Sequence, residues 1–252
     1  PTIQAKIERG EPVSQREAMG VFARLMRVRQ ISNSLHTVTN DTAELSARIT
    51  PKIKKVLDDA QEHLVAENDA KIIMYSNLVR GGVDVLSAGL DARGIKYGVF
   101  AGRGVKGMSE ANRQQAVEDY KSGKTRVIIL TGAGAEGLSL GNTTMVQMVD
   151  GHYNPQRIRQ AEARGIRAGG QAHRALEDRK VDVRRYVSAI PRGFFKKLFG
   201  VDSKKGVDEW VYATAARKTA ANNQLRSALQ ARSEHEKKRR DSKLYRWFGG
   251  EP

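Results

Sequence analysis

The chain has 252 residues, and its 44 Lys and Arg against 28 Asp and Glu give a formal net charge of +16. It has no cysteine and only five scattered histidines, which excludes disulfides, thiolate metal sites and any histidine cluster with metal-ligand spacing. No stretch approaches the roughly 18 consecutive apolar residues of a membrane-spanning helix, so the basic charge points to polyanions, nucleic acid first.

The first predicted helix covers about 14 to 34, after a connector at 1–13. Ser14 and Glu17 have the spacing of a capping box, and apolar residues then recur at helical intervals (Met19, Phe22, Leu25, Met26). A polar, Thr-rich stretch at 37–49 is a predicted loop. Thr50-Pro51 then marks a second helix, with an N-cap hydroxyl and proline at its first position.

Short apolar runs alternate with helical segments from residue 71 onward. We predict strands at 71–76, 95–100, 126–130 and 145–149, with helices at about 83–94 and 109–120. This alternation predicts an α/β fold in which a parallel sheet has helices on both faces. Ligands of such sheets bind at the carboxyl ends of the strands, where the sequence has Ser76-Asn77, Ala101-Gly102, Thr131-Gly132 and Asp150.

A helix beginning near Asn154-Pro155 places four polar side chains on one face. Positions 157, 160, 164 and 167 are neighbours on a helix and read Arg, Gln, Arg, Arg. Two arginines one turn apart, beside the rim of a sheet, have the fork-shaped permanent charge that binds phosphate. A solvated basic face is the alternative.

Three segments resemble motifs of superfamily 2 helicases and Swi/Snf-type DNA translocases. Residues 160–167 resemble motif VI, residues 131–140 resemble motif V, and 150–155 resemble the Asp-x-x-Trp-Asn-Pro segment that joins them in Swi/Snf proteins. Residues 25–33 are similar to the Leu-Arg-x-Ile-Cys-Asn stretch that leads into the second lobe. A strand at 181–187 and a helix opening at 207–212 are most similar to the helicase-like ATPases of large DNA viruses and phages.

This resemblance implies a RecA-like C-terminal lobe and a set of site residues. Arg164 and Arg167 would be arginine fingers that stabilise charge on the γ-phosphate of ATP. Departing from the usual Gly-Arg-Ala, the first finger sits in Ala163-Arg164-Gly165. Gln160, Glu136 and Gly137 would adjoin the nucleotide. The implied DNA contacts are Thr131, Gly132, Ser76, Asn77 and Arg103; capping of the next helix remains open for Ser76-Asn77, and a flexible turn for the loop around Arg103.

A complete motor also needs a phosphate-binding loop and an acidic box for Mg²⁺, and the sequence has neither. Gly123-Lys124-Thr125 precedes its strand and is predicted to be a helix-to-strand turn. We therefore expect a second lobe whose partner, the first lobe, lies upstream in a parent polypeptide or on another chain, and which is inactive alone. The start at Pro1 instead of Met also suggests a piece of a longer polypeptide. ATP and Mg²⁺ would be bound mainly by the first lobe.

The predicted organisation has three parts: an N-terminal connector and helix (1–49), a RecA-like lobe (50–190), and a basic helical extension and tail (191–252). Residues 190–252 hold fifteen Lys and Arg against seven Asp and Glu. A helix is predicted at 207–233, and 234–252 is either a frayed, solvated tail or a contact with the DNA backbone.

The partners would be duplex or single-stranded DNA inside a cell, in cytoplasm, nucleoid or nucleus, with a viral or phage origin as one option. The alternative function is a non-catalytic nucleic-acid-binding module, regulatory or virion-associated, on a helicase scaffold.

Overall fold

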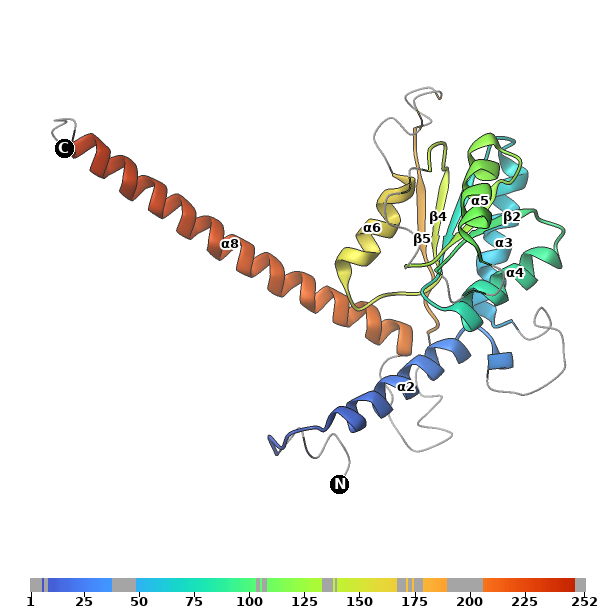
Figure 1. The fold of residues 1–252 in the computed structure, drawn as a ribbon, viewed down its shortest axis with the longest axis horizontal. Helices are drawn as coiled ribbons and strands as arrows, with labels where there is room; N and C mark the ends of the chain where they lie inside the picture. The colour runs from blue at the N-terminus through green and yellow to red at the C-terminus, as the bar shows by residue number, and fades with distance from the viewer. Residues whose placement is uncertain are drawn as a thin grey trace.

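The fold is a five-stranded parallel sheet with helices on both faces (Figure 1). A computed structural model describes residues 6, 9–37, 49–102, 105, 108–132, 138, 140–166, 171, 174, 179–189 and 206–247, with the backbone alone at 37, 164 and 238–247. The sheet order is β2-β3-β1-β4-β5, and the α/β prediction is confirmed. The strands are β1 (Ile72–Tyr75), β2 (Tyr97–Phe100), β3 (Val127–Leu130), β4 (Met145–Met148) and β5 (Asp182–Arg185).

Alternate residues of the central strands face two different layers of helices. In β1, Ile72 and Met74 pack with helices α3 (Pro51–Ala66) and α4 (Asp84–Asp91). Ile73 and Tyr75 face the layer formed by α5 (Glu110–Ser122), α6 (Pro155–Gly165) and the first turns of α8 (Val207–Trp247). Because both faces are covered, the central strands are mainly apolar and do not alternate with polar residues. The polar exception, Gln147 of β4, is buried and donates hydrogen bonds to Val56 O at 2.9 Å and to Tyr186 Oη at 2.8 Å.

The ends of the helices follow the local sequence, with one exception. Ser109 accepts a hydrogen bond from Asn112 N at 3.1 Å, and α5 ends at Gly123 with φ +82°, so Gly123-Lys124-Thr125 is the predicted helix-to-strand turn. Thr50 precedes α3 as predicted, but its hydroxyl does not cap the helix. It donates to Ser32 O at 2.8 Å, which ties the start of α3 to the preceding helix.

That preceding helix, α2 (Gln15–Ile31), has the predicted capping box: Glu17 N donates to Ser14 Oγ at 3.3 Å, and Ser14 N donates to Glu17 Oε2 at 3.0 Å. It ends three residues earlier than predicted and is followed by a 3-10 turn, Leu35–Thr37. Another short element, the π turn Val79–Val83, leads into α4. Most of the predicted loop at 37–49 lies outside the described residues.

Helix α8 is the largest difference from prediction. It continues beyond the predicted end at 233 through 234–247, where we predicted either a frayed, solvated tail or a contact with the DNA backbone, and it extends away from the sheet (Figure 1). Its sequence is rich in Ala, Gln, Lys and Arg, which favour helix, and Arg232 pairs with Glu236 one turn away at 3.1 Å. In the part of the chain that the structure describes, no helix has the length and apolar character to cross a membrane. The division into 1–49, 50–190 and 191–252 stays a prediction.

Candidate functional site

The carboxyl ends of β1, β3 and β4 form one rim, which carries four residues of the predicted site: Ser76, Asn77, Thr131 and Gly132. The register aligns Tyr75 with Leu130 and with Met148, so the residues that follow each strand lie together. Thr131 is buried, and its hydroxyl accepts a hydrogen bond from Gly102 N at 3.3 Å. Thr131 thus joins the ends of β2 and β3.

Gly132 is the point at which three polar side chains converge. A Cβ built on it would lie 3.0 Å from Tyr75 Oη, 3.3 Å from Asn77 Oδ1 and 3.6 Å from Arg157 Nη1. Tyr75 donates to Asn77 Oδ1 at 3.0 Å, and burial raises the pKa of the Tyr75 hydroxyl, so it remains a protonated donor. Glycine is needed here because a side chain would crowd the tyrosine and the amide. The exposed Arg157 brings a cation to the same spot.

Ser76 does not share this exposed position. It is fully buried, its hydroxyl donates to the Asp150 carboxylate, and the same oxygen accepts from Leu78 N at 3.1 Å. Ser76 therefore neither faces a ligand nor caps the next helix, and we remove its side chain from the predicted DNA contacts. Asn77 stays at the rim, where its Nδ2 donates to the carbonyls of Asp150 and Gly151 at 3.4 Å each.

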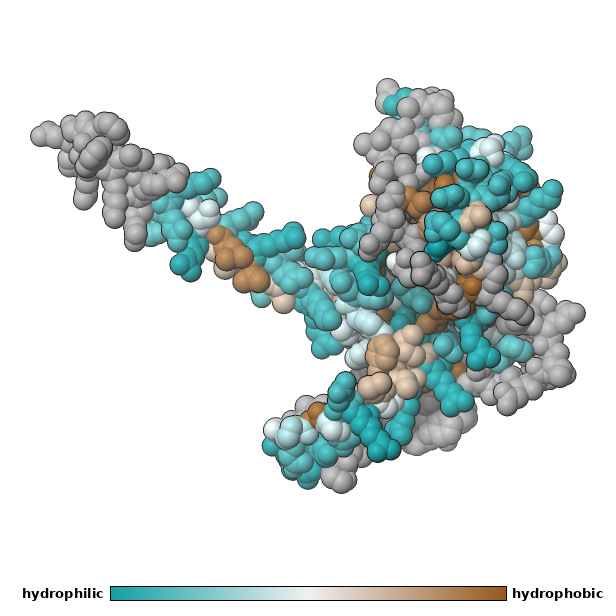
Figure 2. All heavy atoms as spheres, in the orientation of Figure 1, coloured by the Kyte–Doolittle hydropathy of each residue, from teal (hydrophilic) through white to brown (hydrophobic). Residues whose placement is uncertain are grey.

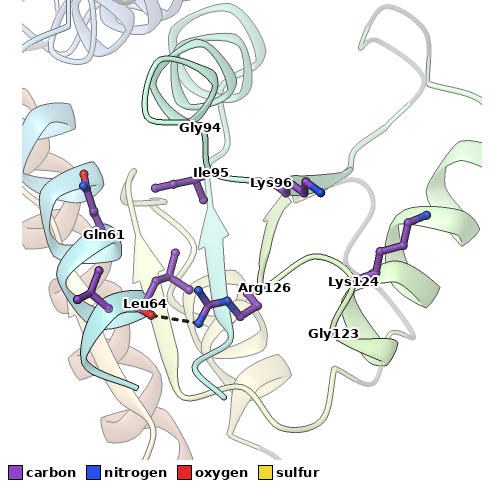
Figure 3. A pocket seen from close by; sticks show the side chains of 9 residues that line it. Gln61, Leu64, Gly94, Ile95, Lys96, Gly123, Lys124 and Arg126 are labelled. Atoms are coloured by element: carbon purple, nitrogen blue, oxygen red, sulfur yellow. Dashed lines mark hydrogen bonds between the residues drawn. The ribbon is translucent and has the colours of Figure 1, made fainter. Parts of the chain in front are cut away.

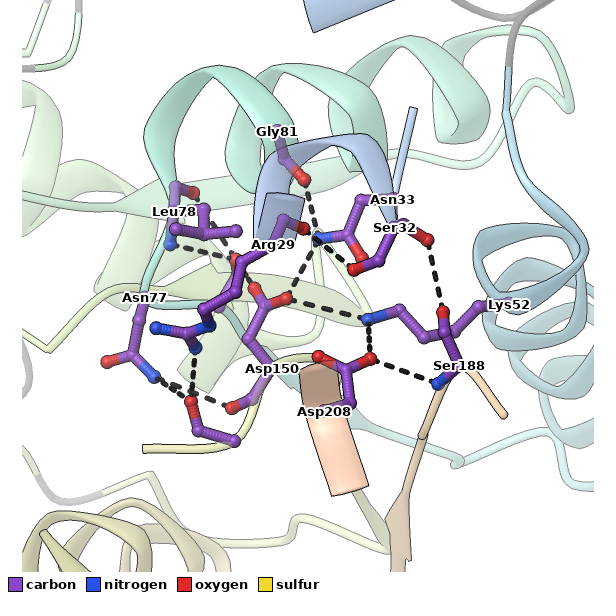
Figure 4. A network of polar contacts seen from close by, with 12 residues as sticks. Arg29, Ser32, Asn33, Lys52, Asn77, Leu78, Gly81, Asp150, Ser188 and Asp208 are labelled. Atoms are coloured by element: carbon purple, nitrogen blue, oxygen red, sulfur yellow. Dashed lines mark hydrogen bonds and ion pairs between the residues drawn. The ribbon is translucent and has the colours of Figure 1, made fainter. Parts of the chain in front are cut away.

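A buried charge cluster lies behind the rim and joins elements from both ends of the chain (Figure 4). Lys52 of α3 lies 2.8 Å from Asp208 of α8 and 3.7 Å from Asp150, and all three side chains are at most 4% exposed. Ser188 N also donates to Asp208, at 3.0 Å. The cluster therefore fixes Asp150, the first residue of the turn that leads into α6.

Helix α2 holds the same turn from its other side. Arg29, which is 2% exposed, donates to Gly151 O and lies 5.5 Å over the ring of Tyr153. Asn33 donates to Asp150 Oδ1 at 2.8 Å and to Gly81 O at 2.6 Å. Both residues belong to the stretch that resembles the Leu-Arg-x-Ile-Cys-Asn segment, so this signal marked them, although their roles were not predicted.

Helix α6 carries the predicted motif VI face up to Arg164. Asn154 caps it by accepting from Gln156 N at 3.0 Å, and Ile158 packs inward while Arg157 and Gln160 are exposed. The helix ends at Gly165, so it does not extend to Arg167 as the predicted face required. Arg167 lies outside the described residues, as do Glu136, Gly137 and Arg103, and at Arg164 the backbone alone is described.

Gly165 explains the departure from the usual order of small residues around the first finger. A Cβ at this position would overlap Val146 Cγ2 of β4 and lie 3.1 Å from Thr143 Cγ2. Ala163, by contrast, is exposed. The small residue that the sheet requires is therefore the one after Arg164, and α6 lies close against β4 at its last turn.

A hollow of about 410 Å³ opens at the opposite, amino-terminal edge of the sheet and is distinct from the rim (Figure 3). Its most prominent cation, Arg126, donates through Nη1 to the carbonyls of Leu64 at 3.0 Å, Asn68 at 3.2 Å and Glu67 at 3.3 Å. Lys124 is 3.2 Å from Asp119. The Arg126 contacts close the carboxyl end of α3 and the Lys124 contact joins the end of α5 to the following turn, so these two cations serve the fold.

Comparison with known proteins identifies the domain that carries this rim. Residues 55–169 match the family of helicase conserved C-terminal domains. A protein of Acanthamoeba polyphaga mimivirus named as an ATP-dependent RNA helicase is 29% identical over 157 residues, which cover 62% of this chain and 34% of the relative. The Arabidopsis thaliana protein CHROMATIN REMODELING 5 is 25% identical over 203 residues, 79% of this chain and 10% of the relative. The chain thus corresponds to a part of each relative.

Among solved structures, the C-terminal part of the Fun30 ATPase domain is similar with a TM-score of 0.49 and 19% sequence identity. The alignment covers 77% of this chain and 53% of that one.

Proposed function

We propose that the chain is the C-terminal lobe of a superfamily 2 helicase, the second motor lobe of a Swi/Snf-like, ATP-dependent DNA helicase or translocase, on the ground that residues 55–169 match the family of helicase conserved C-terminal domains. The observation that carries the proposal is the family match together with the rim, where the motif V loop, Asn77 and the motif VI helix meet. ATP hydrolysis requires a first lobe in the same polypeptide or on another chain.

In this proposal the motif VI helix acts on ATP held mainly by the first lobe. Arg164 and Arg167 stabilise the charge that develops on the γ-phosphate oxygens, and Gln160, Glu136 and Gly137 contact the nucleotide. Mg²⁺ neutralises the phosphate chain and is likewise bound mainly by the first lobe. Arg29 and Asn33 hold the turn at 150–153 that leads into α6. These contacts support the proposed role, because an arginine finger is effective only when its helix holds it in a fixed position.

The rim supplies the nucleic-acid contacts. The backbone at Thr131-Gly132 lets a phosphate approach closely, while the Asn77 amide and the Arg157 guanidinium donate hydrogen bonds to it. Arg103 would add a charge from the neighbouring loop. Arg157, which the sequence placed on the basic face of α6, joins this set because its guanidinium lies beside Gly132. DNA is proposed as the nucleic acid because of the Swi/Snf resemblance. In a binding assay, an RNA duplex of equal sequence would be the competitor that tests the preference for DNA.

The test uses the parent polypeptide with its first lobe, or the two lobes mixed, and measures ATP turnover with and without saturating DNA. We expect R164A and R167A each to lower DNA-stimulated turnover by about 10³-fold, within the range known for arginine fingers, because each removes charge from the transition state. DNA affinity should change less than about twofold in both variants.

The matched control is R159A, which removes an exposed arginine from another side of the same helix and should leave turnover unchanged. The chain without a first lobe should show no ATPase activity. Unchanged turnover in both finger variants would refute the assignment. A parent polypeptide that lacks a phosphate-binding loop and an acidic box would favour the alternative, a non-catalytic binding module.

A further inference from the structure

Helix α8 leaves the lobe and continues far beyond its last contact with the core. Its buried residues are in its first turns, at Asp208, Val211 and Ala215, whereas every residue from Ala220 to Lys237 is exposed. At a rise of about 1.5 Å per residue, the 28 residues from 220 to 247 extend for about 42 Å. We call residues 217–247 the α8 arm; Figure 1 shows it extending free of the sheet, and in Figure 2 the part whose side chains are described is mostly hydrophilic.

The α8 arm is strongly basic. Residues 217–247 include ten Lys or Arg and three Asp or Glu. In the region where side chains are described, five cationic residues are exposed: Arg217, Lys218, Arg226, Arg232 and Lys237. Farther along, the sequence continues with basic residues at 238, 239, 240, 243 and 246.

Charge and composition decide between the possible partners of this arm. Two exposed leucines, Leu225 and Leu229, are too few for the sustained apolar seam of a coiled coil, and a second copy would bring an equally basic helix alongside. A rod of cations about 42 Å long matches a polymer with regularly spaced anionic groups, and a nucleic-acid strand has a phosphate every 3.4 Å or so.

We propose that the α8 arm binds the phosphate backbone of the nucleic acid, as a second contact separate from the rim. The proposal rests on the proposed function only in taking nucleic acid as the polymer that the lobe engages. A fully engaged arm would span roughly 12 base pairs, so it lengthens the footprint of the lobe without reading sequence.

The experiment measures binding of the full chain, without ATP, to a fluorescein-labelled 40-base-pair duplex by anisotropy from 50 to 300 mM KCl. The arm variant is R217Q/K218Q/R226Q/R232Q/K237Q, since glutamine retains helix propensity. We expect at least tenfold weaker binding at 100 mM KCl, and a slope of log affinity against log salt that is smaller by about 2 to 4. Circular dichroism should show unchanged helix content.

The control variant removes the same number of charges from the lobe: K54Q/K96Q/K121Q/K124Q/K180Q, five exposed lysines outside the rim and the arm. It should weaken binding by less than threefold. Equal losses in both variants would show that net charge alone acts, and unchanged binding by the arm variant would show a merely solvated helix; either result overturns the proposal. The proposal would also be overturned if polyglutamate displaced the labelled duplex as effectively as unlabelled DNA does. None of these outcomes bears on Arg164 and Arg167, so failure here is distinct from failure of the motor assignment.

Discussion

At the scale of single residues, Gly165 sets how closely the motif VI helix can approach the sheet. In G165A the new methyl would overlap Val146 Cγ2, in a place where the backbone of α6 already lies against β4. Overpacking of this kind costs about 1 to 3 kcal/mol, which exceeds the gain of about 1 kcal/mol from replacing glycine in a helix. We expect a net loss of up to about 2 kcal/mol in the free energy of unfolding, measured by urea denaturation.

The chain offers a matched control in Gly20, inside α2, where an added Cβ meets nothing within 4 Å. G20A should stabilise the protein by about 0.5 to 1 kcal/mol, because alanine lowers the entropy cost of the helix. Equal stabilisation by both substitutions would mean that the last turn of α6 can move away from β4 at little cost in free energy. In that case the position of the preceding residue, Arg164, would not depend on the contact with β4.

The same residue shows what sequence can and cannot predict at this scale. The resemblance indicated small residues on either side of Arg164, but only the packing against Val146 shows that the one at 165 is required. Ser76 is the converse case. Its position at the end of a strand predicted a ligand contact, yet its hydroxyl is taken by Asp150, a residue 74 positions away in the chain.

At the scale of elements, the ion pair between Lys52 and Asp208 joins α3 to the start of α8. In K52M the carboxylates of Asp208 and Asp150, each 1% exposed, lose their nearby cation. Removal of one partner from a buried pair typically costs about 3 to 5 kcal/mol, because the remaining charge is left uncompensated. We expect a loss of that size in thermal or urea unfolding, with part of it recovered in K52M/D208N.

The control for this prediction is K54M on the same helix. Lys54 also pairs with an aspartate, Asp58, at 2.7 Å, but its side chain is 66% exposed. Exposed pairs contribute little, so the change should stay within about 0.5 kcal/mol. Similar losses in K52M and K54M would show that the buried cluster has no special role in joining the two helices.

The elements themselves were predictable where the signal was local. Four strands of the sheet, the capping box of α2 and the glycine that ends α5 follow from neighbouring residues, whereas β5 was expected only from the resemblance; the structure confirms them all. The cluster behind the rim was not predictable, because Lys52 and Asp208 are 156 residues apart and each reads as an ordinary surface charge in its own helix. The extent of α8 was mispredicted for a related reason: a charge run without a buried face can be a tail or a helix, and composition alone does not decide.

At the scale of the whole molecule, the chain combines a compact unit with a helix that leaves it. The buried contacts of Arg29, Lys52 and Asp208 bring α2, the sheet and the first turns of α8 into one cooperative body. The exposed part of α8 has no such support, and an isolated helix is only marginally stable in water. The two parts should therefore open with very different free energies.

Hydrogen exchange measured by mass spectrometry on the full chain checks this division. Amides of 211–215, next to the buried Val211 and Ala215, should exchange at the slow rate of the central strands. Amides of 222–237 should exchange at least about a hundredfold faster, since their helix opens without disrupting the core. Added 40-base-pair duplex should slow exchange selectively in 222–237, because a bound helix opens less often. Slow exchange along all of α8 in the free chain would mean that the exposed segment is packed in solution, and the chain could not then be divided in this way.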